Sequence, residues 1–304
     1  MTSMRFAKMH GIGNDYIYVD AAAEHIDDAP ALARAVSDRH TGIGGDGLIL
    51  ILPATQGSGA HARMRIFNAD GSEAQMCGNG IRCVTKFVVD RGMSIENPLR
   101  IETARGVLEM RWWLGCDDRV SDVEVDMGAP LLSAHEIGLA WPEVAGAAQI
   151  VARNWPQTLH CDDARVESGA TLVSMGNPHI VFWCGDVARV PIEVVGPAIE
   201  RHRFFPQRIN VHFVEVLSRT ELRMRTWERG SGVTLACGTG ASAVCVAGVL
   251  ENRSDRAVRI HLPGGDLDLK WDAQDGRVRM RGPATHVFDG EFTLQELRVL
   301  DAAE

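Results

Sequence analysis

An internal duplication constrains this sequence more than any other feature. When Cys77 is aligned with Cys237, an offset of 160 positions, both copies read Cys-Gly-x-Gly and continue into a mostly apolar segment. Upstream, residues 13–17 match residues 176–180 at an offset of 163. Two matches in the same order at nearly the same offset predict a chain of two similar halves. Tight turns alone would explain the repeated glycines, but not a cysteine at the same point of each copy.

The residue patterns predict mostly strands, with one enclosed helix in each half. Apolar and polar residues alternate at 123–127, 211–214, 267–270 and 278–280, which is typical of half-buried strands. Residues 81–89 and 241–250 are mostly apolar on all sides, so we expect helices that other elements surround. Residues 32–36 indicate part of a further helix. The predicted fold class is therefore α+β, with a helix enclosed by sheet in each half.

Composition narrows the class of protein. The 304 residues are 45% hydrophobic and 23% charged, an ordinary balance for a globular chain of about two domains. A net charge of −9 disfavours a nucleic-acid or anionic-membrane surface. We read no signal peptide at residues 1–8 and no apolar stretch that could span a membrane. Because the seven cysteines are odd in number and scattered, we expect reduced thiols and a cytoplasmic protein.

Each Cys-Gly-x-Gly motif directly precedes a predicted helix. The first-turn N–H groups of a helix lack partners, and the helix dipole is positive there. A thiol at this point should have a pKa below its ordinary value of about 8.5, and glycines let the backbone approach a ligand closely. Each half is therefore expected to place a reactive thiol beside a site for a carboxylate.

Two facing thiols suit the inversion of a stereocentre. One thiolate can remove a proton from one face of a carbon, and the other thiol can return a proton to the opposite face. Helix N-termini aimed at an α-carboxylate would stabilise the charge that develops. The chain has few lysines, none in an obvious Schiff-base setting, and no Walker or Rossmann glycine fingerprint in context. We therefore expect no cofactor.

The other cysteines and the histidines show no metal pattern. There is no Cys-x-x-Cys pair and no ligand spacing among the histidines, so no metal is expected. A lone cysteine near an apolar helix is more often a small core residue than a nucleophile. The cysteines interpreted in this way are Cys83, Cys116, Cys161, Cys184 and Cys245. A Cys77–Cys237 disulfide is an alternative, which we interpret as an inactivating side reaction.

Motifs along nearly the whole chain point to one family. The first half has Lys-Met-His-Gly-Ile-Gly-Asn-Asp at 8–15, Gly-Ile-Gly-Gly-Asp at 42–46, Phe-Asn-Ala-Asp-Gly-Ser at 67–72 and Gln-Met-Cys-Gly-Asn-Gly-Ile-Arg-Cys at 75–83. The second half has Met-Gly-Asn-Pro-His at 175–179, Asn-Val at 210–211, Trp-Glu-Arg-Gly at 227–230 and Ala-Cys-Gly-Thr-Gly-Ala at 236–241. In this order and spacing, the sequence resembles the diaminopimelate epimerases.

The resemblance implies a pyridoxal-independent epimerase that converts LL-2,6-diaminopimelate to the meso form, in the lysine and cell-wall pathway. It implies two pseudo-symmetric domains, each a β-sheet rolled around a central helix. The expected N-terminal domain is 1–129 and the C-terminal domain 130–290, with a last strand at 291–304 that returns to the first domain. The implied partner is a small amino-acid substrate, with no nucleic acid or membrane, and a homodimer is possible.

The resemblance also assigns roles to residues. Cys77 and Cys237 are the implied acid/base pair. The implied proton-transfer helpers are His179 and Glu228, and Glu228 is also an implied substrate-binding residue. The helix N-terminal groups at Gly78, Asn79, Gly238 and Thr239 would hold the reacting carboxylate. The distal end of the substrate would be fixed by Asn14, Asn68, Asn177, Asn210 and Arg229, since arginine and amides suit a carboxylate and an amine. Asp15 and Asp46 are interpreted as turn or structural residues.

The sequence departs from the family pattern at three places. Many members carry Gln where this chain has Gly47, and that side chain contacts substrate, so the contact cannot come from a side chain here. Residues 112–118 and 142–156 match no assigned motif. We expect these two segments to alter loops and not the chemistry.

Three other functions stay open. A proline racemase or hydroxyproline epimerase would use the same thiol pair, but such enzymes usually have His where Asn79 stands. A thiol–disulfide redox protein would need both cysteines but not the asparagines or Arg229. A non-catalytic carboxylate-binding protein of this fold would need neither thiol.

Overall fold

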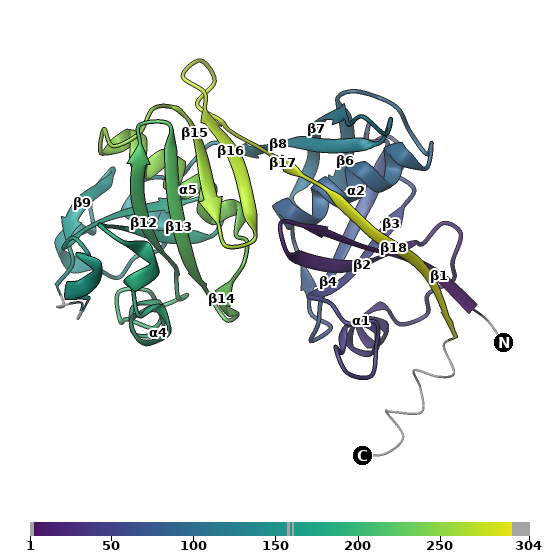
Figure 1. The fold of residues 1–304 in the computed structure, drawn as a ribbon, viewed down its shortest axis with the longest axis horizontal. Coiled ribbons are helices and arrows are strands. Elements are labelled where there is room, and N and C mark those ends of the chain that lie inside the picture. Colours follow the sequence, from purple (N-terminus) through teal and green to yellow (C-terminus); the bar gives the residue numbers. More distant parts are fainter. Residues whose placement is uncertain (1–2, 157–158, 160, 294–304) are drawn as a thin grey trace. The chain divides into compact units, whose positions relative to one another are not determined.

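The chain forms two units in the computed structural model, which describes residues 3–156, 159 and 161–293. Unit 1 contains the chain up to Val125 and from Gly282 onward, and unit 2 contains Asp126–Arg281. Figure 1 shows the strands and helices of each unit. Apart from residues 291–293, the expected last strand at 291–304 lies outside the described residues.

Unit 1 is one sheet with a helix against it. Its strands are β1 (Ser3–Gly11), β2 (Asn14–Asp20), β3 (Gly47–Leu52), β4 (Ala62–Asn68), β5 (Glu73–Ala74), β6 (Leu99–Thr103), β7 (Gly106–Leu114), β8 (Val120–Gly128) and β18 (Thr285–Thr293). The pairing order is β18-β1-β2-β3-β4-β6-β7-β8, with β5 also beside β4. The β2–β3 and β4–β6 pairs are parallel and the others are antiparallel.

Unit 2 repeats this arrangement. Its strands are β9 (Ile150–Asn154), β10 (Gly169–Ser174), β11 (Pro178–Cys184), β12 (Asn210–Ser218), β13 (Glu221–Glu228), β14 (Gly232–Thr234), β15 (Ala257–Leu262), β16 (Gly265–Trp271) and β17 (Val278–Pro283). The order is β9-β10-β11-β12-β13-β15-β16-β17, with β14 beside β13. The parallel pairs are β11–β12 and β13–β15, at the same places as in unit 1.

The matching strand orders confirm the α+β fold of two similar halves. In unit 1 the place of β9 is taken by β18, which pairs with β1 from Ser3↔Thr293 to His10↔Thr285. The predicted alternation is also present. In β8, for example, Val123, Val125 and Met127 are buried, and the residues between them are partly exposed.

One enclosed helix lies in each sheet, as the sequence predicts. Helix α2 (Gly78–Asp90) packs against β1, β2, β4 and β7, and α5 (Gly238–Leu250) packs against β10, β11, β12, β15 and β16. Both helices begin directly after the repeated cysteine, three residues before the apolar runs that predicted them. In α2, every residue from Gly78 to Val89 is buried.

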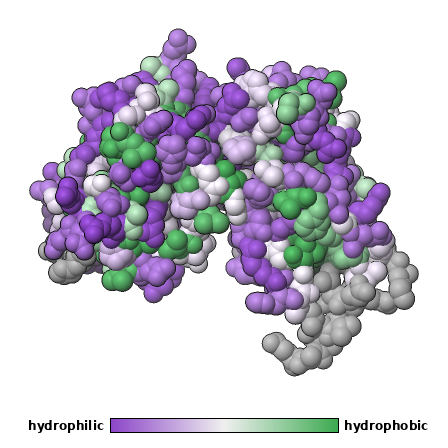
Figure 2. All heavy atoms as spheres, in the orientation of Figure 1, coloured by the Kyte–Doolittle hydropathy of each residue, from purple (hydrophilic) through white to green (hydrophobic). Residues whose placement is uncertain are grey.

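The remaining helices lie outside the sheets. Helix α1 (Ala29–Ser37) extends the predicted 32–36 segment, and α3 (Ala134–Ile137) and α4 (Ile192–Glu200) belong to unit 2. Asp28 caps α1 by accepting a hydrogen bond from the N–H of Ala31. Three short 3-10 helices occupy 142–144, 162–164 and 187–189. On the face drawn in Figure 2, hydrophilic side chains predominate and hydrophobic ones gather in a few small areas.

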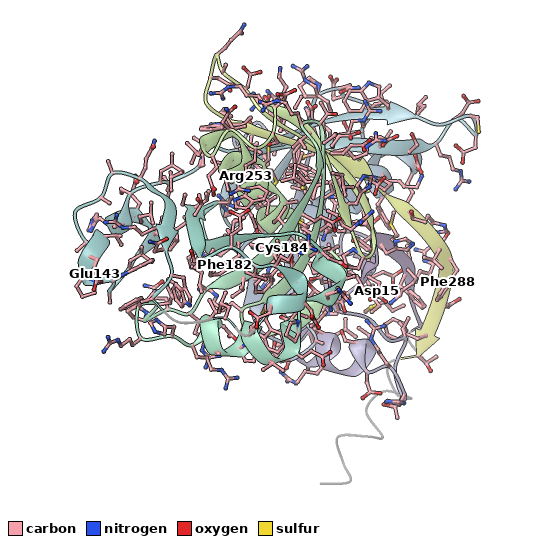
Figure 3. The ribbon with its side chains drawn as sticks, turned by 60° about the vertical axis from the view of Figure 1, so that its left-hand side comes forward. Asp15, Glu143, Phe182, Cys184, Arg253 and Phe288 are labelled. Atoms are coloured by element: carbon pink, nitrogen blue, oxygen red, sulfur yellow. The ribbon has the colours of Figure 1, made fainter. Side chains whose placement is uncertain are left out.

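Two expectations about unassigned segments are wrong in part. Residues 112–114 are in β7 and residues 150–154 form β9, so these segments are not purely loops. Trp155 from the second segment packs edge-to-face against Trp141, which directly precedes that segment, with ring centroids 5.7 Å apart in a core cluster of unit 2. Phe182 on β11 belongs to the same cluster (Figure 3). Cys116 is exposed, so its interpretation as a core residue is also wrong; the other four cysteines interpreted in that way are buried.

The close approach of α5 to β12 can be tested by a substitution at Gly240. A Cβ at this position would lie 2.4 Å from His212 Cε1 and 3.0 Å from Cys237 Sγ. We expect Gly240→Ala to lower the free energy of unfolding by about 1–3 kcal/mol, since the ring must move in a packed interior. Denaturant unfolding measures the effect. Gly146→Ala is the control, because a Cβ there meets open space, and equal stability loss in both variants would contradict the packing argument.

Candidate active site

Cys77 of unit 1 lies at the N-cap of α2, with its backbone in an extended conformation. Its sulfur accepts a hydrogen bond from the Gly80 N–H at 3.3 Å and donates one to Asn14 Oδ1 at 3.3 Å. The thiol is partly exposed and forms no disulfide. The repeated cysteine therefore occupies the helix end predicted for it and directly touches one expected binding residue.

Asp46 fixes the orientation of Asn14. The Asn14 side-chain NH₂ donates to Asp46 Oδ2 at 2.7 Å, so its carbonyl oxygen is the end that faces Cys77. Arg39 pairs with both Asp46, at 3.0 Å, and Asp15, at 2.7 Å. Lys8 also pairs with Asp15, at 2.6 Å. The two aspartates, interpreted from sequence as structural, therefore anchor the loop that orients a site residue.

Burial opposes ionisation of Asp15, which is labelled in Figure 3. Hydrogen bonds from Arg39 and Lys8 outweigh burial, and the pKa of the Asp15 carboxyl is lowered below its ordinary value. The carboxylate is therefore charged at neutral pH and holds β1, β2 and the Arg39 segment together.

Gly47 leaves no space for a side chain. A Cβ there would lie 2.1 Å from the carbonyl oxygen of Phe67 and 2.8 Å from Tyr16 Cε1. The Tyr16 ring is buried, and burial, followed by the charge of Cys77, raises the pKa of its hydroxyl well above 10. In this chain the neutral Tyr16 ring occupies the space beside Gly47.

The other expected residues of unit 1 are held by local contacts. Asn68, at the end of β4, donates from its side-chain NH₂ to Ser72 Oγ at 2.9 Å and pairs across the sheet with Gly47. Gly78 and Asn79 form the first turn of α2 and are buried, and the Gly78 carbonyl accepts from the fully buried Arg82 at 3.3 Å.

Cys237 lies at the N-cap of α5 in unit 2 and is buried, with 4% of its surface exposed. Its sulfur is 3.8 Å from Thr239 Oγ1. Burial is the main cause that raises the pKa of this thiol well above 9, and the charge of Glu228 adds to it. The Gly240 N–H and the Thr239 hydroxyl act in the opposite direction. The expectation of a lowered pKa is therefore wrong for Cys237, since burial and a neighbouring carboxylate outweigh the helix end.

Glu228 connects the thiol to β14. Its carboxylate accepts a hydrogen bond from Thr234 Oγ1 at 2.5 Å and also interacts with the Cys237 thiol. A carboxylate beside a thiol favours the protonated sulfur and can accept its proton.

His179 is fully buried beside a second histidine. Its Nε2 is 3.0 Å from Asn177 Oδ1, and its Nδ1 is 2.9 Å from His212 Nε2. The NH₂ of Asn177 donates to Thr239 Oγ1 at 3.3 Å. Burial first, then the charges of His212 and Arg229, lower the pKa of His179 well below 6.5. The structure thus joins Asn177, His179 and Thr239 in one hydrogen-bonded group, and Thr239 places this group next to Cys237.

Asn210 and Arg229 form a second group in unit 2. Asn210 Oδ1 accepts from the Arg229 backbone N–H at 3.0 Å, and the Asn210 NH₂ donates to the Pro178 carbonyl at 2.9 Å. The Arg229 guanidinium donates to the Gln207 carbonyl at 3.0 Å. Both side chains are therefore positioned by backbone groups of neighbouring segments.

Several residues in these networks were missed by sequence reasoning. They are Tyr16, Arg39, His212, Thr226 and Thr234. His212 lies in the alternating segment 211–214, where the pattern predicts a half-exposed face, but the structure buries its side chain completely. The partner of His212 could not be found that way: Thr226 is opposite it across β12 and β13, and only the register shows this.

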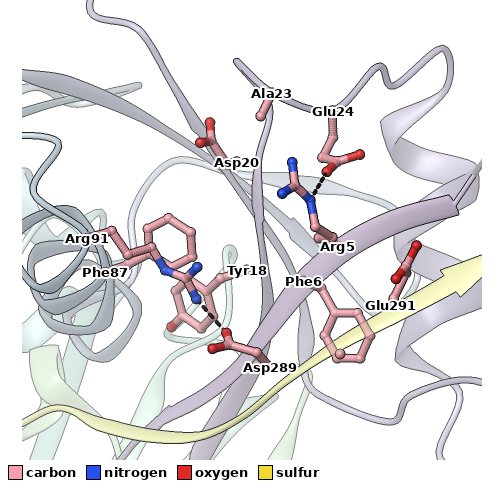
Figure 4. Close-up of a pocket in the computed structure, with 11 residues that line it drawn as sticks. Arg5, Phe6, Tyr18, Asp20, Ala23, Glu24, Phe87, Arg91, Asp289 and Glu291 are labelled. Carbon is pink, nitrogen blue, oxygen red and sulfur yellow. Dashed lines mark hydrogen bonds and ion pairs between the residues drawn. The ribbon is translucent and has the colours of Figure 1, made fainter.

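A cavity of about 490 Å³ in unit 1 is a separate feature (Figure 4). Its lining includes Phe6, Tyr18 and Phe87 but none of the expected site residues. Two ion pairs belong to its lining, Arg5–Glu24 at 3.0 Å and Arg91–Asp289 at 2.5 Å. Its arginines are engaged by carboxylates, which does not favour an anionic substrate.

Among the described residues, no group of three or more His, Cys, Asp or Glu side chains could hold a metal ion. Within the same residues, no helix is long and apolar enough to cross a membrane.

Solved structures define the class by fold. A PhzF-family phenazine biosynthesis protein from Bacillus anthracis aligns with a TM-score of 0.70 and 15% identity, covering 97% of this chain and all of that one (100%). A probable proline racemase from Agrobacterium radiobacter aligns with a TM-score of 0.66 and 16% identity, over 96% of this chain and 93% of that one. The chain thus has the fold of this class of two-halved α+β proteins.

Sequence relatives give the family. The model described as "Diaminopimelate epimerase" matches residues 6–132 and 171–287. The diaminopimelate epimerase of Moorella thermoacetica is 48% identical, covering 96% of this chain and 100% of the relative. That of Methanococcus maripaludis is 45% identical, over 96% of this chain and 100% of the relative. The chain belongs to the diaminopimelate epimerase family.

The charge of Glu228 can be tested through Cys237. Because a carboxylate beside a thiol raises the thiol pKa, we expect Glu228→Gln to lower the pKa of Cys237 and speed its alkylation at a fixed pH. Iodoacetamide labelling followed by peptide mass spectrometry measures the rate. Glu215→Gln is the control, since Glu215 pairs with Arg223 near Cys184. Unchanged or slower labelling of Cys237 in Glu228→Gln would contradict this assignment.

Proposed function

We propose that this protein inverts one α-carbon of LL-2,6-diaminopimelate to give meso-diaminopimelate, without a cofactor, in the formation of lysine and peptidoglycan precursors. The observation that carries the proposal is the pair of cysteines at equivalent positions, each at the N-terminus of an enclosed helix. Membership of the diaminopimelate epimerase family supports the substrate. The acid/base roles of individual residues are our proposal.

In the proposed reaction, one thiolate removes the α-proton and becomes a thiol. The electron pair of the broken C–H bond is delocalised toward the α-carboxylate. The other thiol then gives its proton to the opposite face of the carbon and becomes a thiolate. Cys77 and Cys237 exchange these roles with the direction of reaction, and Glu228 can accept the Cys237 proton when the resting thiol must ionise.

The helix ends would stabilise the developing charge. The first-turn N–H groups at Gly78, Asn79, Gly238 and Thr239 are candidates to bind the reacting carboxylate, because the N–H groups and the positive end of the dipole at a helix N-terminus favour an anion. In a buried site these oriented donors stabilise an enolate-like charge more than water does.

The asparagines divide into two groups. The resemblance implies a distal role for all of them, but Asn14 touches Cys77 and Asn177 bonds to Thr239 beside Cys237, so we assign these two to the reacting end instead. Asn68, Asn210 and Arg229 are assigned to the distal carboxylate and amine, because arginine binds a carboxylate through two parallel donors.

Observations weigh against the alternatives. A redox protein needs an accessible thiolate, whereas Cys237 is buried and its pKa is raised. A proline racemase would act on a substrate without a distal zwitterion, which leaves the arginine without a role. Because the mechanism needs both thiols reduced, we also place the protein in the cytoplasm.

A homodimer is a further proposal. The terminal strand β18 exposes Val287 and Phe288 at 51% and 45% (Figure 3 labels Phe288). Such apolar side chains on a sheet edge favour association with a second surface. Sedimentation of the wild-type protein and of Phe288→Ser would test it, with a monomeric wild type as the contradicting result.

The reaction is tested by proton NMR of LL-diaminopimelate in D₂O with the reduced protein. We expect loss of the α-proton signal and appearance of the meso isomer. Cys77→Ala and Cys237→Ala should each lower the rate at least about a hundredfold, the usual contribution of a positioned acid or base. Cys116→Ala, an exposed cysteine, is the control. Retained epimerisation in either site variant would exclude the two-thiol mechanism, and exchange with proline alone would move the assignment to the racemases.

The distal assignment is tested by Arg229→Ala. We expect KM to rise more than about tenfold, or roughly 1.4 kcal/mol, because the distal carboxylate loses its ion-pair partner. Arg223→Ala is the matched control, since Arg223 is half-exposed and pairs with Glu215. A near-normal KM in Arg229→Ala would refute the assignment.

A further inference from the structure

Tyr16 is a buried tyrosine of β2 to which the proposed reaction assigns no role. The residue is 6% exposed, and it pairs with Met9 of β1 on one side and with Gly47 of β3 on the other. A Cβ at Gly47 would lie 2.8 Å from Tyr16 Cε1, so the ring lies against this glycine. Three neighbouring strands therefore hold the Tyr16 ring in place.

The duplication aligns Tyr16 with His179 of unit 2. In the repeated motif, each of the two residues is the second after the asparagine. The strand register agrees with this alignment. Tyr16 pairs with Gly47 in the parallel pair β2–β3, and His179 pairs with Asn210 in the parallel pair β11–β12. Each unit therefore has a polar ring at the same point of its sheet.

The Tyr16 hydroxyl forms hydrogen bonds with the side chains of Cys77 and Asn14. Burial, followed by the charge of Cys77, raises the pKa of this hydroxyl well above 10, so it keeps its proton at neutral pH. The Asn14 contact acts in the opposite direction, as a hydrogen donated to the phenol oxygen does. The Asn14 NH₂ has two hydrogens, of which one is donated to Asp46. The hydrogen of the Tyr16 hydroxyl can therefore be donated to the Cys77 sulfur.

The partners that the Cys77 sulfur needs depend on whether it carries a proton. The protonated thiol donates to Asn14 Oδ1 at 3.3 Å. A thiolate can only accept, and the Gly80 N–H, 3.3 Å from the sulfur, is one donor to it. The Tyr16 hydroxyl would be a second donor. Hydrogen bonds to a charged group are about twice as strong as those between neutral groups, so this donor acts mainly on the thiolate.

We propose that Tyr16 is a further catalytic residue, whose hydroxyl donates a hydrogen bond to the Cys77 sulfur when the thiolate forms. The proposal rests on the proposed use of Cys77 as an acid/base thiol. Tyr16 keeps its own proton throughout, so the α-proton of the substrate still passes to and from the sulfur alone. A donor that favours the thiolate lets Cys77 ionise at a lower pH than it would without the hydroxyl.

Other ionisable groups face the same site and stay in place when the Tyr16 hydroxyl is removed. The charged form of Cys77 interacts with groups on α2 and β2, which are Arg82, Cys83 and Tyr18. Asp46 acts on the Tyr16 hydroxyl. Tyr18 is the matched control, because it is buried on the same face of β2 and its hydroxyl donates to the Gly80 carbonyl at 3.5 Å.

Alkylation of Cys77 tests the donor without turnover. Tyr16→Phe keeps the ring and removes only the hydroxyl. We expect the iodoacetamide profile of Cys77, followed by peptide mass spectrometry, to move to higher pH by about one unit or more, because the thiolate loses a hydrogen bond. Tyr18→Phe should leave the profile near that of the wild type. An unchanged profile in Tyr16→Phe would overturn the proposal.

The pH dependence of epimerisation separates this role from a purely structural one. We expect the acidic limb of kcat/KM for LL-diaminopimelate to move to higher pH in Tyr16→Phe. The rate should therefore fall about tenfold on the acidic side and recover as the pH is raised, since one pH unit on the limb corresponds to a tenfold change. A loss of the same size at every pH would overturn the proposal in favour of a packing defect.

Carbon NMR of protein labelled with ¹³Cζ-tyrosine reads the hydroxyl directly. The chain has two tyrosines, so Tyr18→Phe assigns both signals. We expect the Tyr16 signal to move as Cys77 ionises, to stay in the range of a protonated phenol, and to lose this movement in Cys77→Ala. A Tyr16 signal that does not respond to Cys77, or a phenolate at neutral pH, would overturn the proposal. If Cys77→Ala retained epimerisation, the proposed function would fail instead, while the alkylation profile and the Tyr16 signal would still report on the hydroxyl.

Discussion

Both units depend on the N-terminus of a helix that the surrounding sheet encloses. An enclosed helix still has first-turn N–H groups that need partners. A serine or aspartate cap would satisfy one firmly, whereas the sulfur of a cysteine is a weak acceptor. This weak cap is consistent with the proposal that the helix starts bind a carboxylate. Close packing around the helix start also accounts for a glycine there: at Gly240 the backbone approaches His212 so closely that no side chain fits.

Duplication has not made the two sites alike. Cys77 is partly exposed and bonds directly to Asn14, whereas Cys237 is buried, lies beside Glu228 and contacts Asn177 only through Thr239. An inversion needs one group that gives a proton and one that takes it at any moment. Two identical environments would give both thiols the same preference for a proton, so the differences between the halves are consistent with the proposed two-thiol reaction.

The sequence predicts the two enclosed helices of this protein well, but it predicts the contacts between side chains on distant strands poorly. The two apolar runs and the repeated cysteines locate α2 and α5, because a helix without a polar face must be enclosed. The candidate site residues come from motifs spread along the chain, which only the family resemblance connects. The lowered thiol pKa was predicted from the helix end alone and is wrong for Cys237, because burial and Glu228 depend on contacts between distant strands.

The register between neighbouring strands explains why sequence reasoning missed the other contacts. His212 meets Thr226 only because β12 and β13 pair in one particular alignment, and a shift by one residue would turn either side chain to the opposite face. The conformation at Gly47 likewise depends on the carbonyl of Phe67 in the neighbouring strand. No periodicity within a single segment contains this information.

The pairing of β18 with β1 has a consequence for how the chain is made. Unit 2 is one continuous segment, so all of its strands are synthesised before β18. The sheet of unit 1 is completed later, because β1 has no partner on this side until Thr285–Thr293 have been synthesised. Contacts so distant in sequence form slowly, and an open strand edge attracts other chains. Unit 1 is therefore begun first but completed last during translation. A chaperone that binds the nascent chain would have most to protect at the unpaired edge of β1.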